Sequence, residues 1–177
     1  MKVLQLNVRL TEGGAAQVAF AIHNAALDLG IESKYAYGYA KGGLNHPLQS
    51  GDENIIRICS RSGAAFRLAE GKLFGFELIS GFLGIPRNLS DALAWADIVH
   101  LHVLHSYYLS TSSLVEKLKD LKKPIVITAH DHWMVTGRCA FTEGCTSWKA
   151  GCGSCLTRTN YPPSRLDYSR MEYLTKD

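Results

Sequence analysis

The 177-residue sequence predicts an α/β protein: a Rossmann-like open parallel sheet with helices on both faces, plus a cysteine-rich loop. Two observations support this prediction. Short apolar runs of strand length alternate along the chain with longer stretches whose apolar residues repeat at helical spacing. The chain also opens with a strand, a glycine turn, a helix and a second strand, a unit that pairs its strands in parallel through a right-handed crossover. At this length, one domain spanning residues 1–177 is expected.

The opening unit has clear boundaries. Residues 3–6 form a short apolar run between polar residues, which predicts a central first strand. Apolar residues then recur at helical spacing from residue 15 to residue 29, and Gly30 follows at a position where helices commonly end. Residues 34–39 predict the second strand.

The middle of the chain predicts a loop, a strand and a helical hairpin. Turn-forming residues dominate residues 41–53, and residues 55–59 predict a short strand. Residues 60–83 show a mixed pattern: residues 64–69 have helical spacing, and residues 73–83 carry apolar side chains on almost all sides. This pattern predicts a helical hairpin that packs on the core or forms a contact surface. Three glycines are expected to interrupt this hairpin: Gly71, Gly75 and Gly81.

Two further helices flank another strand. Ser90 and Asp91 are expected to cap a short helix, and residues 97–103 predict the strand that follows it. Ser110 or Thr111 is expected to cap the next helix, which runs to residue 121.

Composition and charge limit the classes of function. The net charge is +3 and the pI is about 8.6, a basic excess too small to predict a nucleic-acid partner. No run approaches the ~20 apolar residues that a membrane helix needs. Gln5 and Asn7 interrupt the opening apolar run, which argues against a signal peptide. We therefore expect a cytoplasmic protein, in which clustered cysteines bind metal more often than they form disulfides.

Gly13 and Gly14 lie between the first strand and the first helix. A glycine turn at a helix start exposes backbone N–H groups, and the helix dipole favours an anion there. One interpretation is a loop that lets a phosphate or a sugar approach the backbone. The other is a tight turn without a ligand, because the sequence lacks both the G-x-G-x-x-G fingerprint and an obvious ribose-binding carboxylate.

Histidines gather at the end of the strand predicted at residues 97–103. His100 and His102 lie on the same side of a strand, and His105 follows them. His100 is expected to be a hydrogen-bonded core or strand-end residue and not a catalyst. His102 is closer to the carboxyl end and better placed to reach a cleft, where a neutral imidazole accepts a hydrogen bond from a hydroxyl. Metal binding by these histidines is an alternative with weak support.

A second polar group follows the apolar run at residues 125–127, which predicts a buried strand. His130, Asp131 and Trp133 come directly after it and are costly to bury unless they are paired. The carboxyl end of such a strand faces a cleft in open α/β sheets. We therefore expect these residues to line a cleft, where Asp131 orients or charges an imidazole. The alternative is that Asp131 is a cap and the histidines are structural.

Four cysteines fall within 17 residues in a C-x5-C-x6-C-x2-C pattern. Four thiolates can surround one tetrahedral zinc ion, and a complete set of protein ligands leaves no position for water, so this zinc would be structural. Two disulfides and free thiols are alternatives, and the spacing fits an iron–sulfur cluster poorly. Cys59 stands apart and is expected to be a small buried side chain. The candidate metal ligands are Cys139, Cys145, Cys152 and Cys155.

Four segments of the chain carry a family resemblance: N-V-R-L-x-E-G-G-A-A from residue 7, Y-G-Y-x-K-G-G from residue 37, H-V-L-H-S-Y from residue 102 and H-D-H-W-x-V-T-G-R-C-A-F-T-x-G-C from residue 130. Together they resemble the colanic-acid-type exopolysaccharide glycosyltransferases of glycosyltransferase family 4, which are retaining, nucleotide-sugar-dependent enzymes with the GT-B fold. The resemblance implies two Rossmann-like domains facing a cleft. This chain would be the amino-terminal, acceptor-side domain, without the donor-binding carboxyl-terminal domain, and it is expected to be inactive alone.

The resemblance also implies roles for individual residues. His102 matches an active-site histidine near the transferred sugar, and it is the expected catalytic residue. The glycine turn would lie near the donor diphosphate, and the residues after position 129 would line the acceptor side. No metal or other cofactor is implied for the transfer itself. The expected substrate-binding residues are Gly13, Gly14, His105, His130, Asp131 and Trp133.

The partners implied are a nucleotide-sugar donor and an oligosaccharide or lipid-linked acceptor. The expected location is the cytoplasm, at the cytoplasmic face of the inner membrane. The apolar stretch at residues 73–83 is either a hairpin packed on the core or a peripheral membrane contact. The alternative function is a non-catalytic, zinc-stapled α/β module that binds carbohydrate or protein. A nucleotide-binding oxidoreductase is disfavoured by the missing fingerprint.

Overall fold

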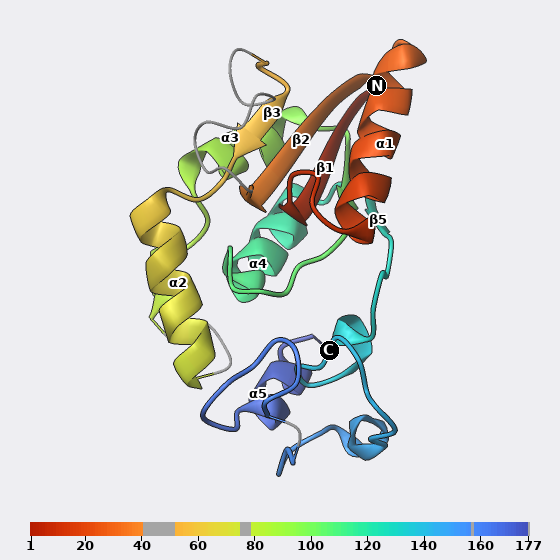
Figure 1. The fold of residues 1–177 in the computed structure, drawn as a ribbon. Helices are drawn as coiled ribbons and strands as arrows, with labels where there is room; N and C mark the ends of the chain where they lie inside the picture. The colour runs from red at the N-terminus through yellow and green to blue at the C-terminus, as the bar shows by residue number, and fades with distance from the viewer. Residues whose placement is uncertain (41–51, 75–78, 157, 177) are drawn as a thin grey trace.

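The computed structural model describes residues 1–40, 52–74, 79–156 and 158–176, and its centre is a five-stranded, all-parallel sheet (Figure 1). The strand order is β3-β2-β1-β4-β5, which is the order of Rossmann-like sheets. The predicted α/β class and the parallel opening unit are therefore confirmed. The strands are β1 (Lys2–Arg9), β2 (Glu32–Tyr39), β3 (Ile55–Arg57), β4 (Ile98–Leu101) and β5 (Ile125–Ile127).

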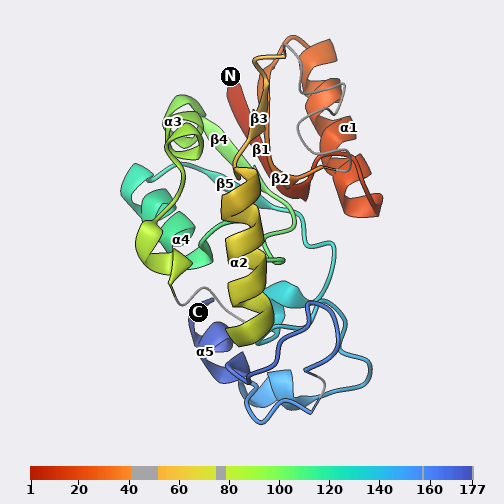
Figure 2. The ribbon, with the colours of Figure 1, turned by 60° about the vertical axis from the view of Figure 1, so that its left-hand side comes forward.

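Helices cover both faces of the sheet, as the sequence predicts (Figure 2). On one face lies α1 (Gly14–Asp28), whose Ala19 packs with the β2 residues Tyr35 and Tyr37. On the other face lie α3 (Arg87–Trp95) and α4 (Thr111–Leu121). The larger apolar core forms between these two helices and the sheet. Its fully buried leucines include Leu4, Leu6, Leu89, Leu93 and Leu114.

Side-chain caps were predicted for two helices, and one of the two predictions is confirmed. The Ser110 hydroxyl accepts a hydrogen bond from the Ser113 N–H at 3.3 Å, so α4 is capped as predicted. The prediction that Ser90 and Asp91 cap α3 was wrong. Ser90 donates its N–H to the Pro86 carbonyl at 3.0 Å, so both predicted caps lie inside the helix. The fixed φ of proline suits a helix start, and here it outweighs the side-chain capping preference.

The helix α2 (Arg61–Phe74) runs through Gly71, where the sequence predicted an interruption. A Cβ atom on Gly71 would lie 2.1 Å from the Tyr107 ring. Close approach of an aromatic ring, and not a break in the helix, therefore accounts for this glycine. The predicted interruption at Gly75 and most of the predicted loop at residues 41–53 lie outside the described residues.

β5 is an exposed strand, and the prediction that it is buried was wrong. Ile125, Val126 and Ile127 are 43%, 47% and 49% exposed. Within the described residues β5 pairs only with β4, so its other edge is open. An apolar run predicts a strand, but its composition does not specify which element covers it.

The chain beyond β5 lies at the carboxyl ends of the strands (Figure 1). Its described residues are irregular apart from short turns and α5 (Ser169–Leu174). It rests on the end of α2, where the N–H groups of Arg165 and Leu166 donate to the Lys72 and Leu73 carbonyls at 2.9 and 3.0 Å. None of the described helices is both long and apolar enough to cross a bilayer. The 3₁₀ turns are η3 (Ser80–Leu83), η4 (Trp133–Val135) and η5 (Ser147–Ala150).

Candidate active site

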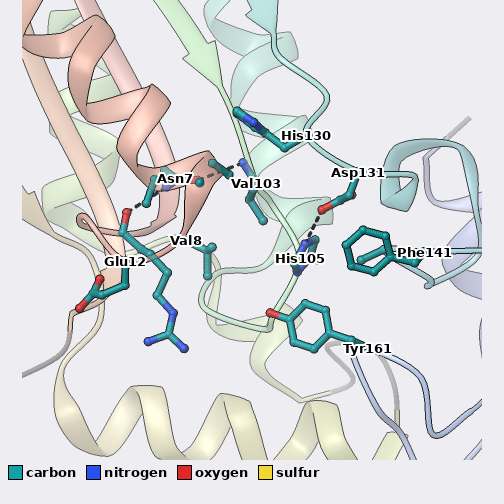
Figure 3. Close-up of a pocket in the computed structure, with 15 residues that line it drawn as sticks. Asn7, Val8, Glu12, Val103, His105, His130, Asp131, Phe141 and Tyr161 are labelled. Carbon is teal, nitrogen blue, oxygen red and sulfur yellow. Dashed lines mark hydrogen bonds and ion pairs between the residues drawn. The ribbon is translucent and has the colours of Figure 1, made fainter.

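A cavity of about 410 Å³ opens at the carboxyl ends of β1 and β4 (Figure 3). The strand order reverses between these two strands, and open α/β sheets bind their ligands at such a switch point. The glycine turn before α1 lies on one side of the cavity, and the segments after β5 lie on the other. The polar side chains that line it are Asn7, Arg9, Glu12, His105, His130, Asp131 and Tyr161.

Asn7 ties the ends of the two central strands together. Its side chain is fully buried, and its Oδ1 accepts a hydrogen bond from the Val103 N–H at 3.2 Å. Its Nδ2 donates to the Arg9 carbonyl at 2.9 Å and to the Tyr35 hydroxyl at 3.1 Å. An amide that both accepts and donates in this way fixes the floor of the cavity where the regular strand ladder ends.

Gly13 and Gly14 bring the start of α1 to the cavity. Gly13 has φ +90°, a conformation that strains other residues, and its carbonyl accepts the N–H of Gln17 at 3.0 Å. A Cβ atom on either glycine would meet no atom within 4 Å, so the space beside both is open. α1 has no side-chain cap and no acidic residue in its first turn, so its dipole and N–H groups favour an anion here.

His105 and Asp131 point toward each other across the cavity wall (Figure 3). His105 Nε2 lies 2.7 Å from Asp131 Oδ2, and Asp131 Oδ1 accepts the Trp133 N–H at 2.8 Å. Burial raises the pKa of Asp131, but the hydrogen bonds from His105 and then Trp133 outweigh it and leave this pKa below its ordinary value. An ionised carboxylate only accepts, so His105 carries a proton on Nε2.

The other nitrogen of His105 connects this pair to the cysteine-rich segment. His105 Nδ1 lies 2.7 Å from Ser106 Oγ, which lies 2.5 Å from the Tyr161 hydroxyl. With a neutral imidazole, Tyr161 donates to Ser106 and Ser106 donates to His105. Ser106 has φ +75°, a costly conformation for serine that the surrounding contacts must maintain. This chain of hydrogen bonds holds Tyr161 in the cavity wall.

His130 lines the cavity, and His102 lies directly behind it. His130 Nε2 is 3.0 Å from His102 Nδ1, and His102 Nε2 is 2.9 Å from Gln5 Oε1. Because a carbonyl oxygen only accepts, this orientation of the Gln5 amide places the His102 proton on Nε2. His102 Nδ1 then accepts the Nε2–H of His130. His130 keeps Nδ1 as an acceptor, and this atom has no hydrogen bond to another described residue.

The imidazoles of His100, His102 and His130 are neutral near pH 7. Burial, together with repulsion from His100 and His130, lowers the pKa of His102 to about 3. Burial likewise lowers the pKa of His100 and of His130, although Asp131 opposes the shift at His130. The His100 ring lies 4.1 Å from the His102 ring, which confirms that both are on one side of the chain. A neutral imidazole at a cavity wall can accept a proton or a hydrogen bond from a hydroxyl.

The cavity gathers most of the residues that the sequence singled out. His102 does not reach it: its side chain is 3% exposed and meets the cavity through His130. Trp133 is 6% exposed and packs in the core, with Lys176 Nζ 3.6 Å from its ring centre. The predicted residues that do line the cavity are Gly13, Gly14, His105, His130 and Asp131.

Several lining residues were not predicted as site residues. Asn7 lies near the carboxyl end of β1 and Glu12 follows that strand, so a polar side chain at the end of a central strand was the available signal. Phe141 and Tyr161 carry no such signal, because they come from irregular segments whose path follows from packing.

The four cysteines predicted to bind metal line a second cavity, of about 440 Å³. None of the four forms a disulfide. As the described residues are arranged, no three His, Cys, Asp or Glu side chains are close enough to hold a metal ion. Cys59 is buried, as predicted, and its Sγ donates to the Tyr108 carbonyl at 2.6 Å.

The fold and the first cavity define a doubly wound α/β domain whose ligand cavity lies at the switch point of the sheet. No protein-family profile and no solved structure matches the chain. The chain is 44% identical over 172 residues to a curated protein of Escherichia coli (strain K12) named "Putative colanic acid biosynthesis glycosyl transferase WcaC". This similarity confirms the resemblance to the colanic-acid-type glycosyltransferases.

The match covers 94% of this chain and 42% of the Escherichia coli protein. The chain therefore spans less than half the length of this relative.

Proposed function

We propose that this chain is the amino-terminal, acceptor-side half of a retaining GT-B glycosyltransferase. The enzyme transfers a sugar from a nucleotide-sugar donor to a lipid-linked oligosaccharide acceptor in colanic-acid-like exopolysaccharide biosynthesis. One observation carries the proposal: a single cavity joins the glycine turn to His130 and to the His105–Asp131 pair. A turn that favours an anion and imidazoles that accept hydroxyl protons together suit a sugar diphosphate and a sugar alcohol.

The donor occupies the side of the cavity formed by Gly13 and Gly14. The match covers 42% of the relative, and we propose that a second domain in proteins of this kind binds the nucleotide. The donor diphosphate then approaches the N–H groups at the start of α1, where no side chain fills the space. Glycine at both positions serves this close approach.

His130 is the side chain that contacts the reacting sugar or its acceptor. Its Nδ1 is the acceptor atom that remains after Nε2 donates to His102. Gln5 and His102 are positioning residues, because they select the tautomer of His130 without lining the cavity. The direct catalytic contact expected of His102 is thus assigned to His130.

The transfer retains the anomeric configuration and passes through an oxocarbenium-like state. The departing diphosphate and preorganised polar groups stabilise that charge. Both oxygens of Asp131 already accept hydrogen bonds, from His105 and Trp133, so this carboxylate orients its neighbours and does not attack the sugar. A hydrolase-type double displacement, with a free carboxylate nucleophile, is therefore not proposed. The transfer requires no metal cofactor.

The acceptor places the protein at the cytoplasmic face of the inner membrane. A lipid-linked oligosaccharide presents its sugar close to the bilayer surface. The turn η3 and the residue before it carry exposed apolar side chains that suit a peripheral membrane contact. These are Ile79, Phe82 and Leu83, which are 52%, 91% and 69% exposed.

Binding and transfer measurements test this proposal separately. Acceptor oligosaccharides are titrated into this chain by calorimetry, and transfer is followed in the complete polypeptide. His130→Ala is expected to weaken acceptor binding about tenfold, the equivalent of one hydrogen bond, and to lower kcat about 100-fold. Glu116→Ala, on the exposed side of α4, is the control and should change neither. Wild-type affinity and turnover in His130→Ala would refute the assignment.

The second candidate is a non-catalytic α/β module that binds carbohydrate or protein and is stapled by metal. The gathering of four cysteines on one cavity is the observation that favours it. This candidate predicts acceptor binding by the chain and no transfer by the complete polypeptide with any nucleotide sugar.

A further inference from the structure

The cysteine-rich region contains a cavity that the proposed transfer reaction does not use. This cavity lies within residues 136–168. Among the described residues of this segment, the turn η5 is the only regular structure. An irregular segment of this length has few backbone hydrogen bonds of its own, so it needs other links to hold one conformation. The four cysteines of the region all face the cavity: Cys139, Cys145, Cys152 and Cys155.

Two tight backbone turns place three of these cysteines at the cavity. Glu143 and Gly144, with φ +46° and +83°, form the turn that leads into Cys145. Cys152, Gly153 and Ser154 have φ +57°, +102° and +49°, which coils the C-x-x-C segment back on itself. Such a run of left-handed residues is costly for non-glycine side chains. A knuckle of this shape brings two thiols of a C-x-x-C pair to one ligand.

The sulfurs accept hydrogen bonds from their surroundings. Gly137 donates its N–H to Cys152 Sγ at 3.0 Å, and Ser147 hydrogen-bonds to the Cys145 thiol through both its side chain and its backbone. These hydrogen bonds help to fix the positions of the two sulfurs at the cavity.

Hydrogen bonds also link the C-x-x-C segment to the start of α5. The Cys155 N–H donates to Asp167 Oδ2 at 2.5 Å, and the Gly153 N–H donates to Ser169 Oγ at 3.1 Å. A Cβ atom on Gly137 would lie 2.3 Å from the Ser169 carbonyl oxygen, so the chain segments are in close contact here. The start of α5 therefore holds the C-x-x-C segment against the residues that precede Cys139.

We propose that Cys139, Cys145, Cys152 and Cys155 together bind one zinc ion in a tetrahedral, all-sulfur site that staples the irregular segment. The cavity they line, of about 440 Å³, has room for the four sulfurs to draw inward onto an ion, which the present spacing of the side chains requires. Four thiolates select a soft or borderline ion such as zinc and leave no position for water. The site is structural and takes no part in sugar transfer.

The proposed zinc site also affects the wall of the candidate active site. Ala140 follows the first cysteine, and its N–H donates to the Tyr161 carbonyl at 3.1 Å while its carbonyl accepts the His132 N–H at 2.9 Å. Ala140, Phe141 and Tyr161 line the candidate active site. The metal therefore fixes one wall of that site from a distance, through the backbone.

Metal content and thiol reactivity test this proposal on the purified chain, prepared under reducing conditions. Elemental analysis should give about one zinc per chain, and a thiol-blocking reagent should release it as four thiols react. Cobalt in place of zinc should give sulfur-to-metal charge-transfer bands and the intense visible bands of a tetrahedral ion. Cys145→Ser and Cys152→Ser should each lower the zinc content several-fold. Cys59→Ser is the matched control and should retain the full content, because a serine hydroxyl can still donate to the Tyr108 carbonyl.

Each contrary result would overturn the site. One such result is less than about 0.2 zinc per chain with all thiols reactive in the native protein. Another is a mass lower by four hydrogen atoms, which indicates two disulfides. The third is a zinc content unchanged in the cysteine variants. If the variants fail to fold, the stepwise release of zinc from the wild-type chain still decides the question. None of these measurements depends on transferase activity.

Discussion

His102 Nδ1 lies 3.0 Å from His130 Nε2, and this contact makes a buried histidine the link between the sheet and the cavity. The contact needs one neutral acceptor nitrogen. His102 supplies it because its other nitrogen keeps the proton and donates it in a hydrogen bond to Gln5 Oε1, 2.9 Å away. Protonating His102 would place two N–H groups face to face. The arrangement is therefore sensitive to acid.

Folding stability should fall as the pH drops below about 6.5. The pKa of His102 is about 3 in the folded protein and about 6.5 in the unfolded chain, so between these values only the unfolded chain binds the proton. The contribution of His102 to stability is complete above the pKa of the unfolded chain and is lost progressively as the pH falls toward the pKa of the folded protein. His102 alone should remove about 2 kcal/mol between pH 7 and pH 5. The lowered pKa values of His100 and His130 act in the same direction, and Asp131 adds its contribution below about pH 4.

Urea unfolding at a series of pH values measures this loss. His102→Gln should flatten the dependence, while His132→Gln, at an exposed position, should leave it unchanged. The pKa of His23 is also lowered by burial, so His23→Gln should remove a separate, additive share. An unchanged slope in His102→Gln would show that His102 is protonated normally in the folded protein.

Gly13 and Gly14 should respond differently to the same substitution. Gly13→Ala should cost about 1–3 kcal/mol of stability, because φ +90° and ψ 161° lie in a region that is essentially restricted to glycine. Gly14→Ala should be neutral or stabilising by up to about 1 kcal/mol, because Gly14 begins α1 and its Cβ would meet no atom within 4 Å. If the donor diphosphate approaches this turn, Gly14→Ala should still raise KM for the nucleotide sugar. A normal KM in Gly14→Ala would favour the interpretation of a tight turn without a ligand.

The sequence was sufficient for the fold because its periodic signals are local. The first strand, α1 and β2 each show their period and their boundary residues within a short window, and the opening βαβ unit then fixes the parallel order. Two of the errors arose where the deciding contact is distant in sequence. Gly71 looks like a helix breaker until Tyr107 is packed on it, and the exposure of β5 depends on which elements cover it.

The candidate site was predictable in place but not in detail. Polar residues at strand ends predicted the cavity, since parallel strands present their carboxyl ends at one edge. Which histidine lines the cavity could not be read from alternation, because β4 ends at Leu101 and His102 turns back toward Gln5. Tyr161 could not be assigned either. It reaches the cavity only because the segment after the cysteines folds back, so that its hydroxyl meets Ser106.

Gly71→Ala should destabilise the protein although alanine favours helices. The added Cβ would lie 2.1 Å from the Tyr107 ring, and relieving such overpacking costs about 1–3 kcal/mol, against a gain of about 1 kcal/mol in helix propensity. Thermal unfolding of the two single variants and the double variant with Tyr107→Ala measures the coupling. In the Tyr107→Ala background, Gly71→Ala should become stabilising. A destabilising effect of equal size in both backgrounds would contradict the ring contact as the cause.

The hydrogen-bond chain from Tyr161 to Asp131 predicts a small loss of stability in Tyr161→Phe and a larger one in Asp131→Asn. Tyr161→Phe removes a terminal donor, and Ser106 can then rotate to water, so the expected loss of stability is about 0.5–1 kcal/mol. Asp131→Asn keeps an oxygen for the Trp133 N–H but turns an NH₂ group toward His105, whose Nε2–H then has no acceptor. The expected loss is about 2–3 kcal/mol, because the buried imidazole must adopt the other tautomer or leave a donor unpaired. Urea unfolding checks both values, and acceptor affinity should fall more in Asp131→Asn than in Tyr161→Phe. Equal losses in the two variants would mean that Asp131 does not orient His105, since only the carboxylate dictates which nitrogen of that ring carries the proton.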